Sequence, residues 1–284
     1  MENCIQKDFY QLPALAGGNF TQFSFGAGES HVRLTSIPAR RVQLLFRYQG
    51  DESLMQLLLL TDALKRAGTE QIDLWIPYFP GARQDRLCNP GEPLSVKVYA
   101  DLINAQHYAS VTVFDPHSDV CPALLHRVKV VKNHAFVAEV LASLPGKITL
   151  ISPDAGANKK VFELSAYLGA LPVVRADKIR DVRDGKIIAT EVFSDNLQGA
   201  HCVIVDDICA GGRTFIELAK KLKEKGAEKI FLIVSHYEGS ANEALLQQSG
   251  IDQVFCTDSL QPDASGLIHV TDVTNYLALQ GDTK

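Results

Sequence analysis

A strand, a turn and the start of a helix follow one another in the segment Val203-Ile204-Val205-Asp206-Asp207-Ile208-Cys209-Ala210-Gly211-Gly212-Arg213-Thr214-Phe215. The apolar run before the two carboxylates is typical of a buried strand, and the glycines after them are typical of a tight turn. Such a turn brings backbone N–H groups and the Thr214 hydroxyl to the positive end of a helix, where phosphate binds. The carboxylates of Asp206 and Asp207 can accept hydrogen bonds from sugar hydroxyls or hold Mg²⁺ through water. The segment predicts a sugar-phosphate site, with an ordinary capped strand–helix turn as the plainer alternative.

The same pattern of helix and strand occurs twice along the chain. Leu60–Leu74 has the periodicity of an amphipathic helix, then a capping glycine, then an apolar strand, and Leu218–Leu232 repeats this order at a constant offset. The apolar run Val42–Phe46 precedes the first copy as Val203–Val205 precedes the second, so each copy completes a β-α-β unit. A shared helical pattern could arise by coincidence, but helix, cap and strand in one register favour a duplication.

Strands and helices also alternate through the rest of the chain. Further strands are predicted at Val111–Phe114, Ile148–Ile151 and Asp252–Cys256, and helices at Leu94–Gln106, Ala135–Ser143 and Lys159–Leu168. This alternation predicts an α/β fold with parallel sheets covered on both faces and ligands at the carboxyl ends of the strands. The break at Ser143-Leu-Pro-Gly146 places a domain boundary near residue 145, which gives domains at 1–145 and 146–284.

The composition narrows the class of protein further. The chain has 284 residues, of which 46% are hydrophobic and 21% charged, and its formal net charge is −5. This length suggests two globular domains, and the mild negative charge disfavours a general nucleic-acid binder or a binder of anionic membranes. The apolar runs are far shorter than the roughly 20 residues that span a bilayer. The N-terminal residues lack the pattern of an export or transit signal, so we expect a cytoplasmic protein.

Two common nucleotide-binding motifs are absent from the sequence. It contains neither G-x-x-x-x-G-K-[ST] nor G-x-G-x-x-G, so a P-loop kinase or a Rossmann dehydrogenase finds no support. It contains no C-x-x-C pair either, which disfavours a structural zinc site. A phosphate must therefore be bound by other means.

Several segments together resemble one enzyme family. The segment around Asp206 resembles the 5-phosphoribosyl-diphosphate loop of the type I phosphoribosyltransferase fold, and Pro77–Arg86 followed by Gly91–Ser95 resembles the ATP-binding flag loop of ribose-phosphate diphosphokinases. Four further segments match this family in order. They are Phe25-Gly-Ala27-Gly28-Glu29, Phe114-Asp-Pro-His117, Ser152-Pro-Asp154-Ala-Gly156 and Asp177-Lys178-Ile-Arg180, the last where the family has Asp-Lys-Arg-Arg. The resemblance covers nearly the whole chain and implies two tandem type I phosphoribosyltransferase-like domains.

The resemblance also implies roles for individual residues. It assigns the nucleotide site to Ala27, Gly28, Glu29, Arg83 and Gln84, the metal to His117 and Asp154, and the catalytic cations to Lys178 and Arg180. It assigns the sugar hydroxyls to Asp206 and Asp207, and the 5-phosphate to Ala210, Gly211, Gly212, Arg213 and Thr214. Each assignment has a plainer alternative. The arginines of the flag loop could belong to a solvated polar loop, His117 could be a structural histidine, and Lys178 and Arg180 could belong to an exposed charged loop.

By this resemblance we expect an enzyme that uses Mg²⁺ and ATP to transfer a diphosphoryl group to ribose 5-phosphate. Family members usually build the nucleotide site across a subunit interface, so we also expect a homo-oligomer. A catalytically silent nucleotide-binding regulator is an alternative of another class, which the presence of the cations Lys178, Arg180 and Arg83 disfavours. A phosphoribosyltransferase that acts on a base is disfavoured by the flag loop and the duplicated domain.

The identity of the acceptor has its own alternative. Where the family has Asp-Thr-Gly-Gly-Thr, this chain has Ala210-Gly-Gly-Arg213-Thr214, which makes the loop more positive by two formal charges. An Arg fork could reach the second phosphate of ADP-ribose, the acceptor of a family branch that serves NAD salvage. Alternatively, Arg213 strengthens binding of the ordinary 5-phosphate or turns outward.

Overall fold

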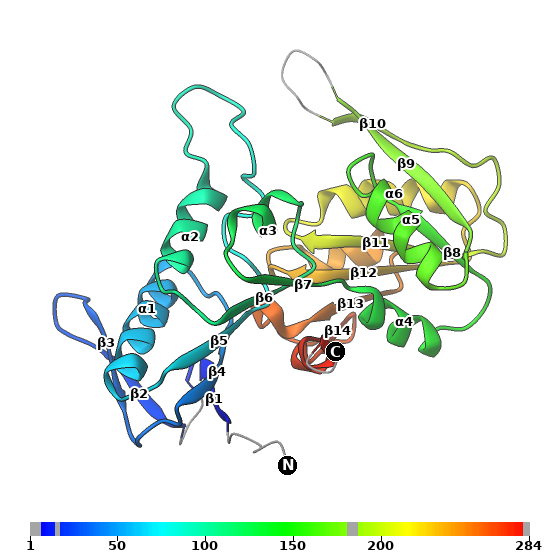
Figure 1. Cartoon of the computed structure of the whole chain (residues 1–284). Helices are drawn as coiled ribbons and strands as arrows, with labels where there is room; N and C mark the ends of the chain where they lie inside the picture. The colour runs from blue at the N-terminus through cyan, green and yellow to red at the C-terminus, as the bar shows by residue number, and fades with distance from the viewer. Residues whose placement is uncertain (1–6, 15–17, 181–186, 281–284) are drawn as a thin grey trace. The chain divides into compact units, whose positions relative to one another are not determined.

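The computed structural model of the chain describes residues 7–14, 18–180 and 187–280, whose course Figure 1 shows. These residues form two compact units. The first comprises the described residues up to Lys132 together with those from Thr274 onward, and the second comprises Asn133–Val273. Each unit is built on its own β-sheet.

The first unit contains a five-stranded parallel sheet in the order β1-β4-β5-β6-β7. Its strands are β1 Lys7–Leu12, β4 Arg41–Phe46, β5 Gln71–Ile76, β6 Ser110–Phe114 and β7 Val128–Val131, and its helices are α1 Asp51–Arg66, α2 Ser95–Asn104, α3 Val120–Leu124, α8 Thr274–Leu277 and the 3-10 turn η2 Ala278–Gln280. A separate antiparallel hairpin pairs β2 Phe20–Ser24 with β3 Ser30–Leu34.

The two faces of this first sheet differ in chemistry. One face buries apolar side chains of α1 and α2, such as Leu57 and Ala100, against the strands. On the other face Phe114 stacks on Tyr276 of α8, with ring centroids 6.1 Å apart. Asp73, also on that face, is buried, but Lys7 and Arg41 each place a nitrogen 3.0 Å from its carboxylate. A buried carboxylate is tolerated when it is paired in this way.

The second unit contains a seven-stranded sheet in the order β10-β9-β8-β11-β12-β13-β14, in which only β10 is antiparallel to its neighbour. Its strands are β8 Ile148–Ser152, β9 Val173–Arg180, β10 Ile187–Val192, β11 His201–Cys209, β12 Lys229–Tyr237, β13 Gln253–Thr257 and β14 Ile268–Thr271. Its helices are α4 His134–Ser143, α5 Asn158–Tyr167, α6 Arg213–Glu224, α7 Glu243–Gln248 and the 3-10 turn η1 Asp258–Leu260. In Figure 1 the long strands β11 and β12 run side by side through this unit.

The two helices of the repeated segment end in the same way. At the end of α1, Thr69 N–H donates to Leu64 C=O at 3.0 Å across Gly68, and at the end of α6, Ala227 N–H donates to Leu222 C=O at 3.0 Å across Gly226. Both glycines have positive φ, 102° and 91°, which only a glycine adopts at little cost. The α/β class, the parallel sheets and the two tandem units are as the sequence predicts.

The division between the units differs from the boundary predicted near residue 145. It lies after Lys132, so α4 belongs to the second unit, where the His134 ring lies 5.0 Å from that of Tyr167 in α5. The described residues from Thr274 onward return to the first unit through Tyr276. The Pro145-Gly146 break marks a local turn, and a turn does not determine which sheet the preceding helix packs on.

Candidate active site

The predicted phosphate loop lies at the carboxyl end of β11. Gly212, its last residue, has φ of 73°, and a Cβ added there would lie 3.0 Å from the Ala241 Cβ and 3.2 Å from Leu246 Cδ2. Both the backbone and the packing therefore require glycine. α6 begins at Arg213, and no side chain of the described residues caps it. The first N–H groups of a helix have no partner within the helix itself. This is the local structure that binds a phosphate group.

Two adjacent carboxylates precede this loop. Asp207 is buried, and its backbone N–H donates to Asp206 Oδ1 at 2.9 Å. Burial raises the pKa of Asp206 well above its usual range, and the neighbouring charges of Asp207 and Asp154 raise it further. A cation or hydroxyl donors at this position would stabilise the ionised carboxylates, which is the chemistry that a Mg²⁺-bound sugar phosphate supplies.

Asp154 reaches the same region from the neighbouring strand β8. Its Oδ1 accepts a hydrogen bond from Ala157 N–H at 3.1 Å, just before α5, and its backbone carbonyl accepts one from the Ser152 hydroxyl at 3.2 Å. β8 pairs directly with β11, so both strands deliver their acidic residues to one edge. The second unit therefore brings Asp154, Asp206 and Asp207 together.

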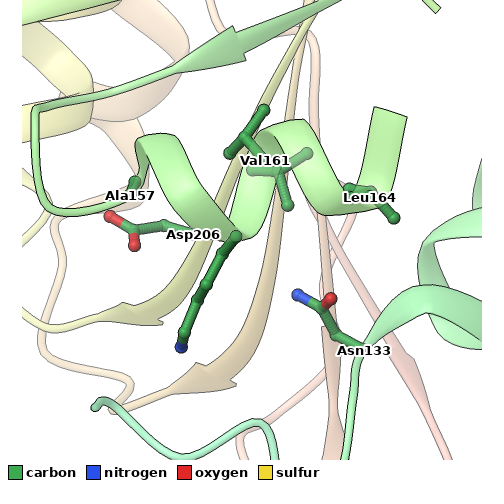
Figure 2. A pocket seen from close by; sticks show the side chains of 7 residues that line it. Asn133, Ala157, Val161, Leu164 and Asp206 are labelled. Carbon is green, nitrogen blue, oxygen red and sulfur yellow. The ribbon is translucent and has the colours of Figure 1, made fainter. Parts of the chain in front are cut away.

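Figure 2 shows a small cavity beside these residues, with Asp206 and Ala157 on its wall and Val161 and Leu164 of α5 further along. Asn133 and Lys160 contribute polar groups to the same wall. Within residues 7–14, 18–180 and 187–280, no three His, Cys, Asp or Glu side chains gather closely enough to hold a metal ion by themselves. The carboxylate donors suit Mg²⁺, which characteristically binds to one or two carboxylates and completes its shell with water and substrate phosphates.

The predicted flag loop, Pro77–Arg86 followed by Gly91–Ser95, comes after β5 in the first unit and is organised by its own hydrogen bonds. The Ser95 hydroxyl donates to Gln84 Oε1, and Val96 N–H donates to the Gln84 carbonyl. Near the tip, Glu92 Oε2 accepts from the N–H groups of Cys88 and Asn89 at 3.1 and 3.0 Å. Because the Gln84 amide oxygen is engaged by Ser95, its amide NH₂ is the group it can offer to a ligand. Sequence reasoning gave no role to Ser95 or Glu92, although both stand in the motif that carries the resemblance.

The other predicted nucleotide residues lie at the tip of the β2–β3 hairpin. Gly28 N–H donates to Phe25 C=O at 2.8 Å and Phe25 N–H to Glu29 C=O at 2.9 Å, which closes the turn that holds Ala27. Figure 1 shows this tip well away from the flag loop within the first unit. A single first unit therefore does not bring Ala27, Gly28 and Glu29 together with Arg83 and Gln84.

The predicted metal residue His117 is exposed and follows β6, again at the carboxyl edge of a parallel sheet. Asp115, two residues earlier, is buried with φ of 39°, and its N–H donates to Val131 C=O at 2.7 Å. A left-handed residue other than glycine is uncommon and concentrates at functional sites. His117 belongs to the first unit and Asp154 to the second, so the pairing of these two residues on one metal ion stays a prediction.

The predicted catalytic cations lie on the β9–β10 ribbon of the second unit. The backbone of Lys178 is opposite Thr190, and that of Arg180 is opposite Ile187. The roles of Lys178 and Arg180 stay predictions.

No helix among the described residues is both long enough and apolar enough to cross a membrane.

Comparison with known protein families and solved structures shows which class of protein this chain resembles. Residues 15–106 match the model of the N-terminal domain of ribose phosphate pyrophosphokinase, and residues 134–258 match the phosphoribosyl transferase domain. The fold is that of a solved phosphoribosylpyrophosphate synthetase from Mycobacterium smegmatis, with a TM-score of 0.81 and 21% identity over 96% of this chain and 97% of that one.

Curated relatives agree at the level of sequence. The chain is 32% identical over 228 residues to a ribose-phosphate pyrophosphokinase of Hyphomonas neptunium, covering 78% of this chain and 71% of the relative. It is 36% identical over 193 residues to one of Ureaplasma parvum, covering 66% of this chain and 57% of the relative. The chain belongs to the ribose-phosphate pyrophosphokinase family.

The raised pKa of Asp206 leads to a stability prediction. The Asp206→Asn variant keeps the acceptor for Asp207 N–H but cannot ionise, so in the metal-free protein its Tm should exceed that of the parent by about 3 °C near neutral pH, as about 1 kcal/mol would cause. The folded parent holds its proton more tightly than the unfolded chain. Its stability therefore falls as pH rises through the folded pKa, and the difference should vanish below about pH 4.

Differential scanning calorimetry from about pH 4 to pH 8 measures this difference. Asp263→Asn, at an exposed position of the same unit, is the matched control and should show no such trend. A Tm difference between Asp206→Asn and parent that stays constant over this range would contradict the prediction.

Proposed function

We propose that the chain transfers the diphosphoryl group of Mg–ATP to the anomeric hydroxyl of ribose 5-phosphate, forming 5-phosphoribosyl 1-diphosphate and AMP. The observation that carries this proposal is the edge of the second unit, where Asp206, Asp207 and the glycine-dependent loop before α6 lie side by side. The names of the relatives describe this activity.

The second unit binds the acceptor in this proposal. The N–H groups at the uncapped start of α6 and the Thr214 hydroxyl bind the 5-phosphate, with Ala210, Gly211, Gly212 and Arg213 forming the rest of the loop. Asp206 and Asp207 accept hydrogen bonds from the ribose hydroxyls, which stabilises the carboxylates that burial and mutual repulsion disfavour. The anomeric hydroxyl is thereby fixed for attack.

The first unit supplies the nucleotide site. Arg83 binds phosphate or stacks on the base, and Gln84 donates through its amide NH₂. The separation of the β2–β3 tip from the flag loop supports a site completed by Ala27, Gly28 and Glu29 of a second copy, and hence a homo-oligomer. A cytoplasmic location stays part of the proposal.

The reaction asks the protein mainly for positioning and charge stabilisation. The anomeric oxygen forms a bond to the β-phosphorus and loses its proton to water. The bond from that phosphorus to the oxygen bridging it to the α-phosphorus breaks, and AMP leaves with that oxygen. Lys178 and Arg180 stabilise the charge that develops on the transferred group. His117 and Asp154 would hold Mg²⁺, which neutralises phosphate charge when bound.

The alternatives receive less support. A catalytically silent regulator would not need the cations Lys178 and Arg180, and the named relatives are enzymes. ADP-ribose as acceptor finds no support among the named relatives, although Arg213 is exposed and no described residue forms an ion pair with it.

The acceptor assay tests the proposal directly. The protein incubated with Mg–ATP should form AMP only when an acceptor is added, and kcat/KM for ribose 5-phosphate should exceed that for ADP-ribose by about tenfold or more, roughly 1.4 kcal/mol. Arg213→Gly should lower kcat/KM for ribose 5-phosphate, and Arg213→Lys should lower it less, because a point charge replaces a fork. Faster reaction with ADP-ribose would transfer the proposal to that acceptor, and absence of acceptor-dependent AMP would favour the silent regulator.

Lys178→Ala should reduce kcat by roughly 10²–10³-fold and leave ATP binding nearly intact, because the lost contact forms mainly in the transition state. Steady-state kinetics with calorimetric titration of ATP separate the two effects. Lys220→Ala, which removes an exposed lysine of the same unit, should change neither quantity. Weakened ATP binding with unchanged kcat would make Lys178 a ground-state contact instead.

His117→Ala should raise the Mg²⁺ concentration needed for half-maximal activity, because one ligand or outer-sphere partner of the metal is lost. Activity should partly recover at saturating Mg²⁺. The control is His126→Ala, an exposed histidine of the same unit. A magnesium titration that overlays that of the parent would refute the assignment.

A further inference from the structure

The two units share a strand–helix frame but differ at its functional edge. The strand registers pair Leu44 with Leu74 in the first unit and Ile204 with Leu232 in the second. Leu74 and Leu232 occupy the same place in the duplicated segment, so Leu44 corresponds to Ile204. Two and three residues beyond Leu44, Phe46 and Arg47 therefore stand where the second unit has Asp206 and Asp207. The first unit lacks the carboxylate pair that receives the sugar.

The helix after this strand also begins differently. α1 and α6 end at the same capping motif, but α1 has 16 residues and α6 has 12. The first turn of α1 therefore occupies the place of the phosphate loop. Asp51 heads that turn, so a carboxylate of the chain itself lies where the second unit is open to an anion.

Two phenols bind this carboxylate. The Tyr99 hydroxyl donates to Asp51 Oδ1 at 2.6 Å and the Tyr48 hydroxyl donates to the same oxygen at 2.9 Å. Hydrogen bonds from Tyr99 and then Tyr48 lower the pKa of Asp51. The two rings meet edge to face, with centroids 6.2 Å apart at 84°. Hydrogen bonds to an ionised acceptor are stronger than those between neutral groups, so Asp51 fixes both rings.

The Tyr99 ring in turn lies against the start of the flag loop. A Cβ added at Gly81, whose φ is 71°, would lie 2.7 Å from Tyr99 Cδ2. The ring therefore touches the backbone two residues before Arg83. On both sides of this contact the chain is anchored, because Phe79 and Ala82 are buried in the first unit. The Tyr48 ring lies 6.4 Å from that of Tyr78, one residue before Phe79.

We propose that Asp51, Tyr48 and Tyr99 are positioning residues for ATP: they form a platform that fixes Gly81 and thereby the orientation of Arg83 and Gln84. This inference rests on the proposed function, in which those two residues bind the nucleotide. The end of the first unit that corresponds in position to the phosphate loop thus supports the loop that binds the second substrate.

The test is Tyr99→Phe, which keeps the ring and removes the hydroxyl that Asp51 holds. KM for ATP should rise about 3–10-fold, kcat should stay within about twofold, and KM for ribose 5-phosphate should not change, because only the preorganisation of the nucleotide loop is lost. Asp51→Asn should have a similar effect, since a neutral amide oxygen holds the phenols less strongly. Calorimetric titration with Mg–ATP should show the same loss of affinity.

Two controls separate positioning from stability. Tyr108→Phe removes a buried phenol that bonds to Thr61 at 2.7 Å at the opposite end of the strands, and it should lower Tm without changing KM for ATP. Asp62→Asn removes a carboxylate from the exposed side of α1 and should change neither.

The outcomes distinguish the inference from the function it rests on. If the parent protein binds ATP and forms AMP but Tyr99→Phe retains the parent KM for ATP, the positioning role is wrong and the proposed function stands. A Tyr99→Phe variant that loses only Tm, as Tyr108→Phe does, also overturns it. If the parent itself binds no ATP, both are overturned.

Discussion

All strands of a parallel sheet end at the same edge, so the segments that follow neighbouring strands lie close together. The candidate site depends on that constraint. Ile151 of β8 lies opposite Ile204 of β11, so Asp154, which follows β8, comes close to Asp206 in the last part of β11. In the first unit, β5 and β6 are neighbours in the same way, and they deliver the flag loop and His117 to one edge. The candidate residues that follow these strands are scattered in sequence, but the sheet order makes them neighbours within each unit.

The same constraint concentrates like charges, and this has an energetic consequence. Burial and the charges of Asp207 and Asp154 make ionisation of Asp206 unfavourable. The folded second unit is therefore less stable with an ionised Asp206 than with a neutral side chain at that position. Ligands that bring hydroxyl donors and a cation relieve this repulsion. Their binding therefore stabilises the folded second unit. Asp73 shows the contrasting solution. Its burial also opposes ionisation, but hydrogen bonds from Ser110 and Lys7, the Lys7 charge and a hydrogen bond from Arg41 outweigh that effect and lower its pKa, so no ligand is needed.

The sequence predicts those parts of the molecule that local signals encode. The apolar runs locate β4, β6, β8, β11 and β13, and the phosphate loop is found because its strand, glycines and helix are contiguous. Features that depend on distant contacts are not predictable in this way. The assignment of α4 rests on the approach of His134 to Tyr167, and the return of the chain rests on Tyr276 reaching Phe114. The hydrogen bond between Asp51 and Tyr99 joins residues that are 48 positions apart, and no spacing rule connects them.

The duplication explains why two similar frames can bind different parts of a reaction. The repeated helices end in the same capping motif, and the two strands that flank each helix pair in parallel, so this strand–helix frame does not distinguish the units. The difference lies in the few residues after one strand. In the second unit, the carboxylates lie in the last part of the strand, the helix begins later, and no side chain of the described residues caps it. In the first unit, Phe46 and Arg47 replace the carboxylates and the helix begins a turn earlier with Asp51, whose negative charge occupies the positive end of the helix. Because that carboxylate holds Tyr48 and Tyr99 through hydrogen bonds, the same end of the frame contacts a neighbouring loop instead of a phosphate in the inference drawn above.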